Sequence, residues 1–142
     1  MLIASDAGLA HLLRRVNTIA LVGASHKPER PSYKVLEFLL AEGFKVTPVN
    51  PGLAGQILQG QAVVGQLADI DHQIDMVDVF REGSALPRVL NETLDIGASA
   101  LWTQLDVRHA EAEALAIDSG LDLVVDKCPV QVMPRLRAQG LM

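Results

Sequence analysis

The sequence contains a single cysteine, few aromatic residues and no long apolar run. One thiol, Cys128, excludes an internal disulfide and any zinc site built from several cysteines. Aromatic residues make up 4% of the chain and the net charge is −5, which argues against binding of nucleic acid or of an anionic membrane surface. No apolar stretch approaches the ~20 residues of a membrane-spanning helix. In the segment from Met1 to Val16 the basic residues follow the apolar ones, unlike a signal peptide, so we expect a cytoplasmic protein.

Length and composition point to one globular domain. The chain has 142 residues, of which 49% are hydrophobic and 20% are charged, so it can bury a core without disulfides or metals. This balance excludes a disordered chain or a coiled coil. We therefore expect residues 1–142 to form a single domain.

Short apolar runs alternate with amphipathic segments along the chain. The runs predict strands at residues 19–22, 45–49, 74–80, 98–102 and 121–125, with helices between them. This alternation predicts an α/β, Rossmann-like fold: a doubly wound, five-stranded parallel sheet of strand order 3-2-1-4-5. Residues 126–142 contain two prolines and are expected to be irregular. Pro48 has no N–H to donate, so its position in the second strand should face an edge or form a bulge.

The loop after the first strand is the strongest candidate for a binding site. In doubly wound sheets, ligands bind beyond the carboxyl ends of the strands, where the strand order reverses. Gly23 allows the backbone to approach a ligand closely, and a helix N-terminus with Ser32 as the expected N-cap follows. Lys27 and Arg30 add positive charge, and His26 is a further donor in the same loop. These features favour phosphate binding; the alternative is an ordinary loop whose charges face water.

Two features argue against a dinucleotide site. Of the G-x-G-x-x-G pattern typical of such sites, the loop has only the first glycine. After the second strand, Asn50 and Pro51 stand where an NAD site has an acid for the ribose hydroxyls. The sequence therefore disfavours NAD as the ligand of this loop.

The next two strand ends carry residues with two interpretations each. Arg81 can hold a phosphate with its planar fork, or it can pair with Glu82 or Asp78 at the surface. Trp102 can form one side of a nucleotide pocket or belong to the core of the sheet. A single tryptophan at this position favours the core. Gln104 lies two residues further on, and its side-chain amide can form hydrogen bonds with a base or with an amide of the ligand.

Cys128 is reactive or structural according to its surroundings. The adjacent Lys127 favours a thiolate, whereas unpaired cysteines are commonly small buried residues, which is the interpretation we favour. No Ser/His/Asp set, pair of catalytic carboxylates or histidine spacing for a metal stands out. We therefore expect no catalytic residue, no metal site and no enzyme activity of the chain's own.

Several motifs, in order, resemble the stand-alone CoA-binding domain proteins of bacteria and archaea. The resemblance spans roughly residues 10–137. It rests on these segments: Ile19 to Ser25, Lys27 to Tyr33, Val49 to Pro51, Gly55, Ile57 to Gly60, Asp75 to Arg81, Leu101 to Gln104, Asp126 to Pro129 and Pro134 to Leu136. The family in turn is similar to the CoA-binding domain of succinyl-CoA synthetase alpha subunits, whose phosphorylated histidine lies in a further domain.

The resemblance implies a Rossmann-like domain that binds coenzyme A, and it implies no reaction. The residues that we expect at the ligand are Gly23, Ala24, Ser25, His26, Lys27, Arg30, Ser32, Tyr33, Asn50, Pro51, Val79, Phe80, Arg81, Trp102 and Gln104. Among them the glycine and the two residues after it would meet the phosphates, and the ends of the second and third strands would border the nucleotide.

The expected function is therefore the binding of CoA or an acyl-CoA through its phosphates and nucleotide. Such a protein delivers or senses CoA, by itself, as a homodimer or with a protein partner. Two alternatives remain open at this point: an NAD(P)-dependent enzyme on the same fold, and a structural interaction module that uses the glycine-rich residues 52–65 as a contact surface.

Overall fold

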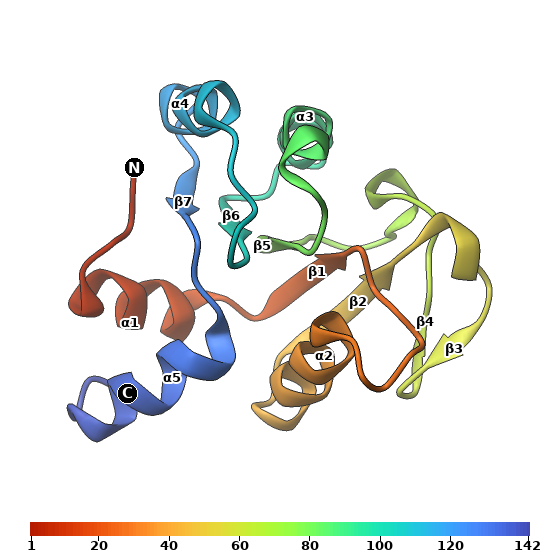
Figure 1. Ribbon diagram of the computed structural model, residues 1–142, viewed down its shortest axis with the longest axis horizontal. Coiled ribbons are helices and arrows are strands. Elements are labelled where there is room, and N and C mark those ends of the chain that lie inside the picture. The colour runs from red at the N-terminus through yellow and green to blue at the C-terminus, as the bar shows by residue number, and fades with distance from the viewer.

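The computed structural model describes residues 1–142 as a parallel sheet with helices on both faces (Figure 1). The sheet consists of β1 (Thr18–Val22), β2 (Lys45–Val49), β5 (Met76–Val79), β6 (Ala100–Thr103) and β7 (Asp122–Val124). The helices are α1 (Asp6–Arg15), α2 (Pro31–Ala41), α3 (Leu86–Asp95), α4 (Ala110–Asp118) and α5 (Pro129–Ala138). A small antiparallel hairpin is formed by β3 (Ile57–Leu58) and β4 (Gln61–Ala62). The α/β, Rossmann-like, doubly wound class predicted from the sequence is confirmed.

The predicted strand order 3-2-1-4-5 is wrong, because β5 lies beside β1 rather than beside β2. The observed order is β2-β1-β5-β6-β7, with every pair parallel, so β2 is an edge strand. The outer side of β2 carries Pro48, whose carbonyl oxygen accepts from the Val64 N–H at 3.1 Å while its own nitrogen has no hydrogen to donate. A short bridge between Val49 and Val64 occupies that side, and β5 therefore pairs with the free side of β1.

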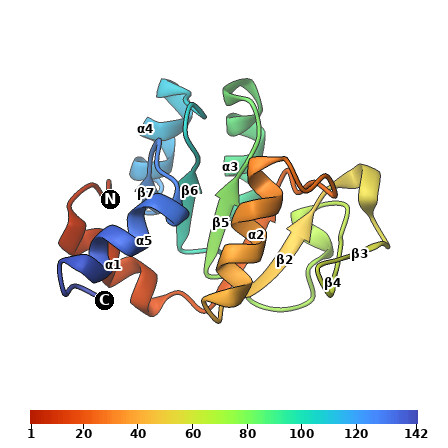
Figure 2. The ribbon, with the colours of Figure 1, turned by 60° about the horizontal axis from the view of Figure 1, so that its bottom comes forward.

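Two hydrophobic cores lie on opposite faces of the sheet. One core packs α1, α2 and α5 against inward side chains such as Leu21, Met76 and Trp102. The other packs α3 and α4 against Val77 and Leu101. Figure 2 shows α1, α2 and α5 in front of the sheet, on the face opposite α3 and α4. Each strand thus buries both of its faces, as the continuous apolar runs in the sequence predict.

The end of the chain is helical, which corrects the expectation of an irregular tail. Pro129 is at the start of α5, where its missing N–H costs no helical bond. Pro134 lies inside the helix on its exposed side, whereas Val132, Met133 and Leu136 are buried against the α1–α2 core. The burial of this apolar stripe outweighs the hydrogen bond that an internal proline removes.

Helix α2 begins two residues earlier than predicted, and Ser32 is not its N-cap. Arg30 is the N-cap residue with extended backbone angles, and Pro31 is the first helical residue. Proline is favoured at this position because its fixed φ angle matches a helix start. Ser32 is consequently turned inward and is buried, and no side chain caps the first turn of α2.

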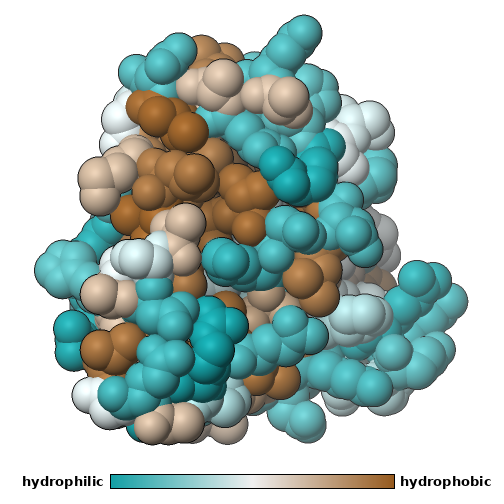
Figure 3. Space-filling view, turned by 60° about the vertical axis from the view of Figure 1, so that its left-hand side comes forward, coloured by the Kyte–Doolittle hydropathy of each residue, from teal (hydrophilic) through white to brown (hydrophobic).

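The far edge of the sheet, at β7, carries an apolar surface. Met1 and Leu2 are exposed and lie along β7, where Leu2 forms a bridge with Leu123. Leu115, on α4 beside β7, is also exposed. Figure 3 shows a broad apolar area on this side of the molecule. No helix has the length and apolar character that crossing a membrane requires.

Candidate functional site

The carboxyl ends of β1, β2 and β5 are in register, and this alignment creates the site. Val22 of β1 is the register partner of both Val49 of β2 and Val79 of β5. The residues that follow these three strands therefore start side by side at one edge of the sheet. Helices α2 and α3 lie on opposite faces, so the chain diverges here and leaves a cleft, as at the switch point of any doubly wound sheet.

Gly23 allows the chain to leave β1 between its two neighbouring strands. Its φ angle is +90°, in the left-handed region that favours glycine. The N–H groups of Gly23 and Ala24 donate to the Val49 carbonyl oxygen at 3.0 and 3.2 Å. A Cβ at position 23 would lie 2.1 Å from the Phe80 carbonyl oxygen. Only glycine therefore fits between the backbones of β2 and β5 at this point.

Asn50 ties the loops after β1 and β2 together. Its Nδ2 donates to the Ala24 carbonyl oxygen at 2.7 Å, and its Oδ1 accepts from the Gly52 N–H at 2.7 Å. Both ends of the side chain amide are thus engaged with backbone groups. Pro51 is exposed at the start of the turn that Asn50 caps. Asn50 therefore positions the rim of the cleft, in addition to lining it.

The first part of the cleft, which we call the loop cavity, lies against the β1–α2 loop and measures about 580 Å³. Its lining includes the predicted residues Gly23, Ala24, Ser25, His26, Lys27, Arg30, Ser32, Asn50, Phe80 and Arg81. The basic side chains of the loop are exposed, while Ser25 Oγ accepts from the Lys27 N–H at 3.1 Å and shapes the turn. The first turn of α2 has no side-chain cap, and because Pro31 has no N–H and Tyr33 and Lys34 donate to the Arg30 carbonyl oxygen, the Ser32 N–H is the one left free there.

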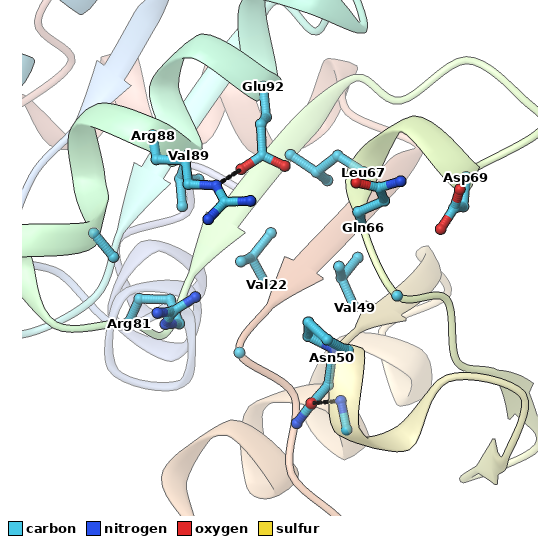
Figure 4. A pocket seen from close by; sticks show the side chains of 15 residues that line it. Val22, Val49, Asn50, Gln66, Leu67, Asp69, Arg81, Arg88, Val89 and Glu92 are labelled. Carbon is cyan, nitrogen blue, oxygen red and sulfur yellow. Dashed lines mark hydrogen bonds and ion pairs between the residues drawn. The ribbon is translucent and has the colours of Figure 1, made fainter.

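The second part, which we call the α3 cavity, measures about 770 Å³ and lies between α3 and the segment after β4 (Figure 4). Gly23, Asn50, Gly52 and Arg81 line both cavities, so the two form one continuous cleft. The Arg81 side chain is exposed and pairs with Glu82 at 3.0 Å. That pairing was one of the two interpretations from the sequence, and it leaves Arg81 at the mouth of both cavities.

The α3 cavity includes residues that reading the sequence did not identify, among them Gln66, Leu67, Asp69, Arg88 and Glu92. The first three of these lie far beyond the end of β2, and the last two lie within α3 rather than directly after a strand. The pattern of strand ends in the sequence does not indicate such positions. Arg88 and Glu92 pair at 3.5 Å, and their i, i+4 spacing is the one feature of the sequence that indicates a contact among these five residues.

Four of the predicted residues lie away from the exposed cleft. Trp102 is fully buried and its Nε1–H donates to the Lys127 carbonyl oxygen at 2.8 Å, so it belongs to the core. Val79 and Gln104 are buried as well, and neither lines a cavity. Tyr33 is half-buried, and its carbonyl oxygen accepts from Gln59 Nε2 at 3.0 Å.

A buried carboxyl belongs to β5, one residue before the end of the strand. Asp78 of β5 is fully buried; its Oδ1 accepts from Gln104 Nε2 at 2.8 Å and its Oδ2 has no partner. Loss of hydration raises the pKa of Asp78 to about 7, against the opposing effect of the Gln104 hydrogen bond. Gln104 thus serves as the partner of a core carboxyl.

Cys128 has the character of a structural thiol. It is the N-cap residue of α5 and is half-buried against the core. Burial raises the pKa of its thiol, and the nearby Asp78 carboxyl acts in the same direction. A raised pKa reduces the thiolate fraction, so the adjacent Lys127 does not make this cysteine a strong nucleophile.

The comparisons with known proteins agree with this geometry. The family described as "CoA binding domain" matches residues 17–134. The uncharacterized protein YneT of Bacillus subtilis is 34% identical over 124 residues, which cover 87% of this chain and 90% of YneT. A solved structure from Thermus thermophilus is 36% identical, with a TM-score of 0.89 and coverage of 94% of this chain and 99% of that one.

A hypothetical protein from Pyrococcus horikoshii OT3 has the same fold, with a TM-score of 0.89 and 32% identity over 94% of this chain and 92% of that one. The family match spans the whole sheet from β1 to β7 and both walls of the cleft. The resemblance seen in the sequence motifs is thereby confirmed, and the chain belongs to the CoA-binding domain family.

Proposed function

We propose that this chain binds CoA or an acyl-CoA in the cleft, through the phosphates and the nucleotide, and catalyses no reaction of its own. The observation that carries the proposal is the gathering of Lys27, Arg30 and Arg81 at the switch point of a chain whose net charge is −5. Cations concentrated at one edge of an acidic protein select an anionic ligand. Membership of the family over residues 17–134 supports CoA as that ligand.

The residues present fit the chemistry of coenzyme A. Guanidinium and ammonium groups form charge-assisted hydrogen bonds with phosphate oxygens, and the N-terminus of α2, with its free Ser32 N–H, adds the positive end of a helix dipole. The cavities of about 770 and 580 Å³ have the size of small-molecule sites, which typically hold about 300–1,000 Å³. Lys27, Arg30 and Arg81 would hold phosphate groups there.

The side chains of the cleft favour binding over catalysis. Arg81 and Arg88 are engaged with neighbouring glutamates, and His26 is exposed with no hydrogen-bonded nucleophile beside it. We therefore infer a role in delivering or sensing CoA. A second copy of the chain or a protein partner stays a prediction from the sequence.

CoA is expected to stabilise the fold, and NADH is not. A ligand at about 100 times its dissociation constant adds roughly 2.7 kcal/mol to the free energy of unfolding. For a domain of this size, that corresponds to a rise of about 5–10 °C in melting temperature. A thermal scan with millimolar CoA, acetyl-CoA, NADH or NADPH measures the effect.

A melt that shifts with NADH or NADPH and not with CoA would contradict the proposed ligand. Release of free thiol from acetyl-CoA in the same mixture, faster than in buffer, would contradict the absence of catalysis. Desulfo-CoA serves as a further probe, because it keeps the phosphates and nucleotide and should stabilise the protein as CoA does.

The charges of the β1–α2 loop are expected to carry a large share of the affinity. Lys27→Ala and Arg30→Ala should each weaken CoA binding by about 1.5–3 kcal/mol, the range for a hydrogen bond to a charged group. Lys34→Ala is the matched control, since Lys34 is exposed on α2 and lines neither cavity. Isothermal calorimetry measures the three dissociation constants; equal losses in all three would indicate a general charge effect instead.

A further inference from the structure

The cleft contains a second group of cations, separate from the β1–α2 loop. Arg88 lies in the first turn of α3 and lines the α3 cavity, together with Arg81, which lines both cavities. The basic residues of the β1–α2 loop line the loop cavity alone. The cleft therefore offers one cationic group at each end, with Arg81 between them.

The two arginines of the α3 cavity pair with carboxylates that leave some of their donors free. Arg88 uses Nε toward Glu92 at 3.5 Å, so neither of its terminal nitrogens is engaged. Arg81 uses one terminal nitrogen toward Glu82 at 3.0 Å, and its Nε and its other terminal nitrogen remain. Figure 4 shows both guanidinium groups on the same side of the cavity, facing the space in front of Val22. Guanidinium groups with free N–H donors are suited to a phosphate group.

The opposite side of the α3 cavity has a different character. Val22 and Val49 form its floor between the two sides, and Gln66 and Asp69 face Arg88 across it (Figure 4). Leu67 adds an apolar wall. Aliphatic side chains of this kind contact the faces of a flat base, and the oxygens of Gln66 and Asp69 accept hydrogen bonds from an exocyclic amino group. The cavity thus combines an anion site with a site for an amino-substituted base.

We propose that the α3 cavity holds the 3′-phosphorylated adenosine of CoA, with Arg88 and Arg81 on the 3′-phosphate. This assignment rests on the proposed function. CoA carries two anionic groups, a diphosphate and a 3′-phosphate on the ribose, and the cleft has two cationic groups. The diphosphate belongs with Lys27 and Arg30 in the loop cavity, and the adenine lies against Val49 and Leu67, with its amino group toward Gln66 and Asp69. Arg88 therefore distinguishes CoA from dephospho-CoA.

Calorimetry with CoA and dephospho-CoA tests the assignment on the wild type, Arg88→Gln and Arg137→Gln. The last is the matched control: it removes the same charge from α5, where Arg137 pairs with Glu42 and lines neither cavity. The wild type and the control should bind CoA about tenfold more tightly than dephospho-CoA at low salt, as expected for one charge-assisted contact. Arg88→Gln should bring the two affinities within about threefold by weakening CoA binding alone.

The outcomes separate this assignment from the function on which it rests. If the wild type prefers CoA and Arg88→Gln keeps that preference, the assignment is overturned while CoA binding stands. If Arg88→Gln weakens both ligands equally, Arg88 contacts another part of CoA and the assignment is overturned as well. Binding of NADPH in place of CoA, with a 2′-phosphate on the ribose, overturns the proposed function and this assignment together. Circular dichroism and melting curves establish that Arg88→Gln and Arg137→Gln, both at exposed positions, leave the fold intact.

Discussion

Gly23→Ala is expected to lower the free energy of unfolding by more than about 3 kcal/mol and to abolish CoA binding. The left-handed φ of +90° disfavours alanine by itself. The larger effect comes from the new Cβ, which would lie 2.1 Å from the Phe80 carbonyl oxygen. That oxygen belongs to backbone that continues β5, so relief of the overlap must separate the ends of β1 and β5. Both cavities are built on these ends.

Gly43→Ala is the matched control for this prediction. Gly43 has a φ of +96°, yet a Cβ there meets no atom within 4 Å. Its substitution therefore carries the backbone cost alone, about 1–2 kcal/mol, and should leave CoA binding unchanged. Urea denaturation gives the two unfolding free energies, and calorimetry gives the affinities. Equal losses of stability in the two variants would mean that the contact with Phe80 is relieved without cost.

Asp78 should make the native state less stable as pH rises from about 4 to about 7. Its pKa is raised from 3.8 to about 7 in the native state because the carboxyl is buried. Between these two values the unfolded chain has released its proton and the native chain retains it, so stability falls as pH increases. The fall begins near the lower pKa and ends near the higher one. Its full size is roughly 4 kcal/mol, at about 1.4 kcal/mol for each pH unit between the two values.

Asp78→Asn isolates this contribution from the other titrating groups. The amide keeps the shape and the oxygen that accepts from Gln104 Nε2, but it cannot ionise. From pH 4 to pH 8, the difference in unfolding free energy between variant and wild type should shift in favour of the variant by roughly 4 kcal/mol. Asp118→Asn, at an exposed position on α4, is the control and should show no such shift. Parallel pH profiles for Asp78→Asn and the wild type would refute an ionisable Asp78 in the core.

Local residue patterns determined the strands and the centre of the binding cleft. A strand that is buried on both faces requires a continuous run of apolar side chains. Such runs end at Gly23 and at Asn50, and they indicate these strand ends independently of the order of the strands in the sheet. The basic β1–α2 loop lies within one short stretch of chain, so its composition already indicates an anion site. The motifs of the family lie in the same segments, so the sequence by itself carries the resemblance.

The tertiary structure decided which distant segments meet. Pro48 indicated an edge strand, but the pairing of β5 with β1 goes together with a distant segment, in which Val64 occupies the outer side of β2. Helix α5 forms because its apolar stripe packs against α1 and α2, a contact that two prolines in the sequence concealed. Arg88 and Asp69 face each other across a cavity although neither follows a strand, and Asp78 lies in the core because its neighbours on both sides cover it. Such positions depend on contacts between residues far apart in the chain. The local sequence pattern does not indicate these contacts.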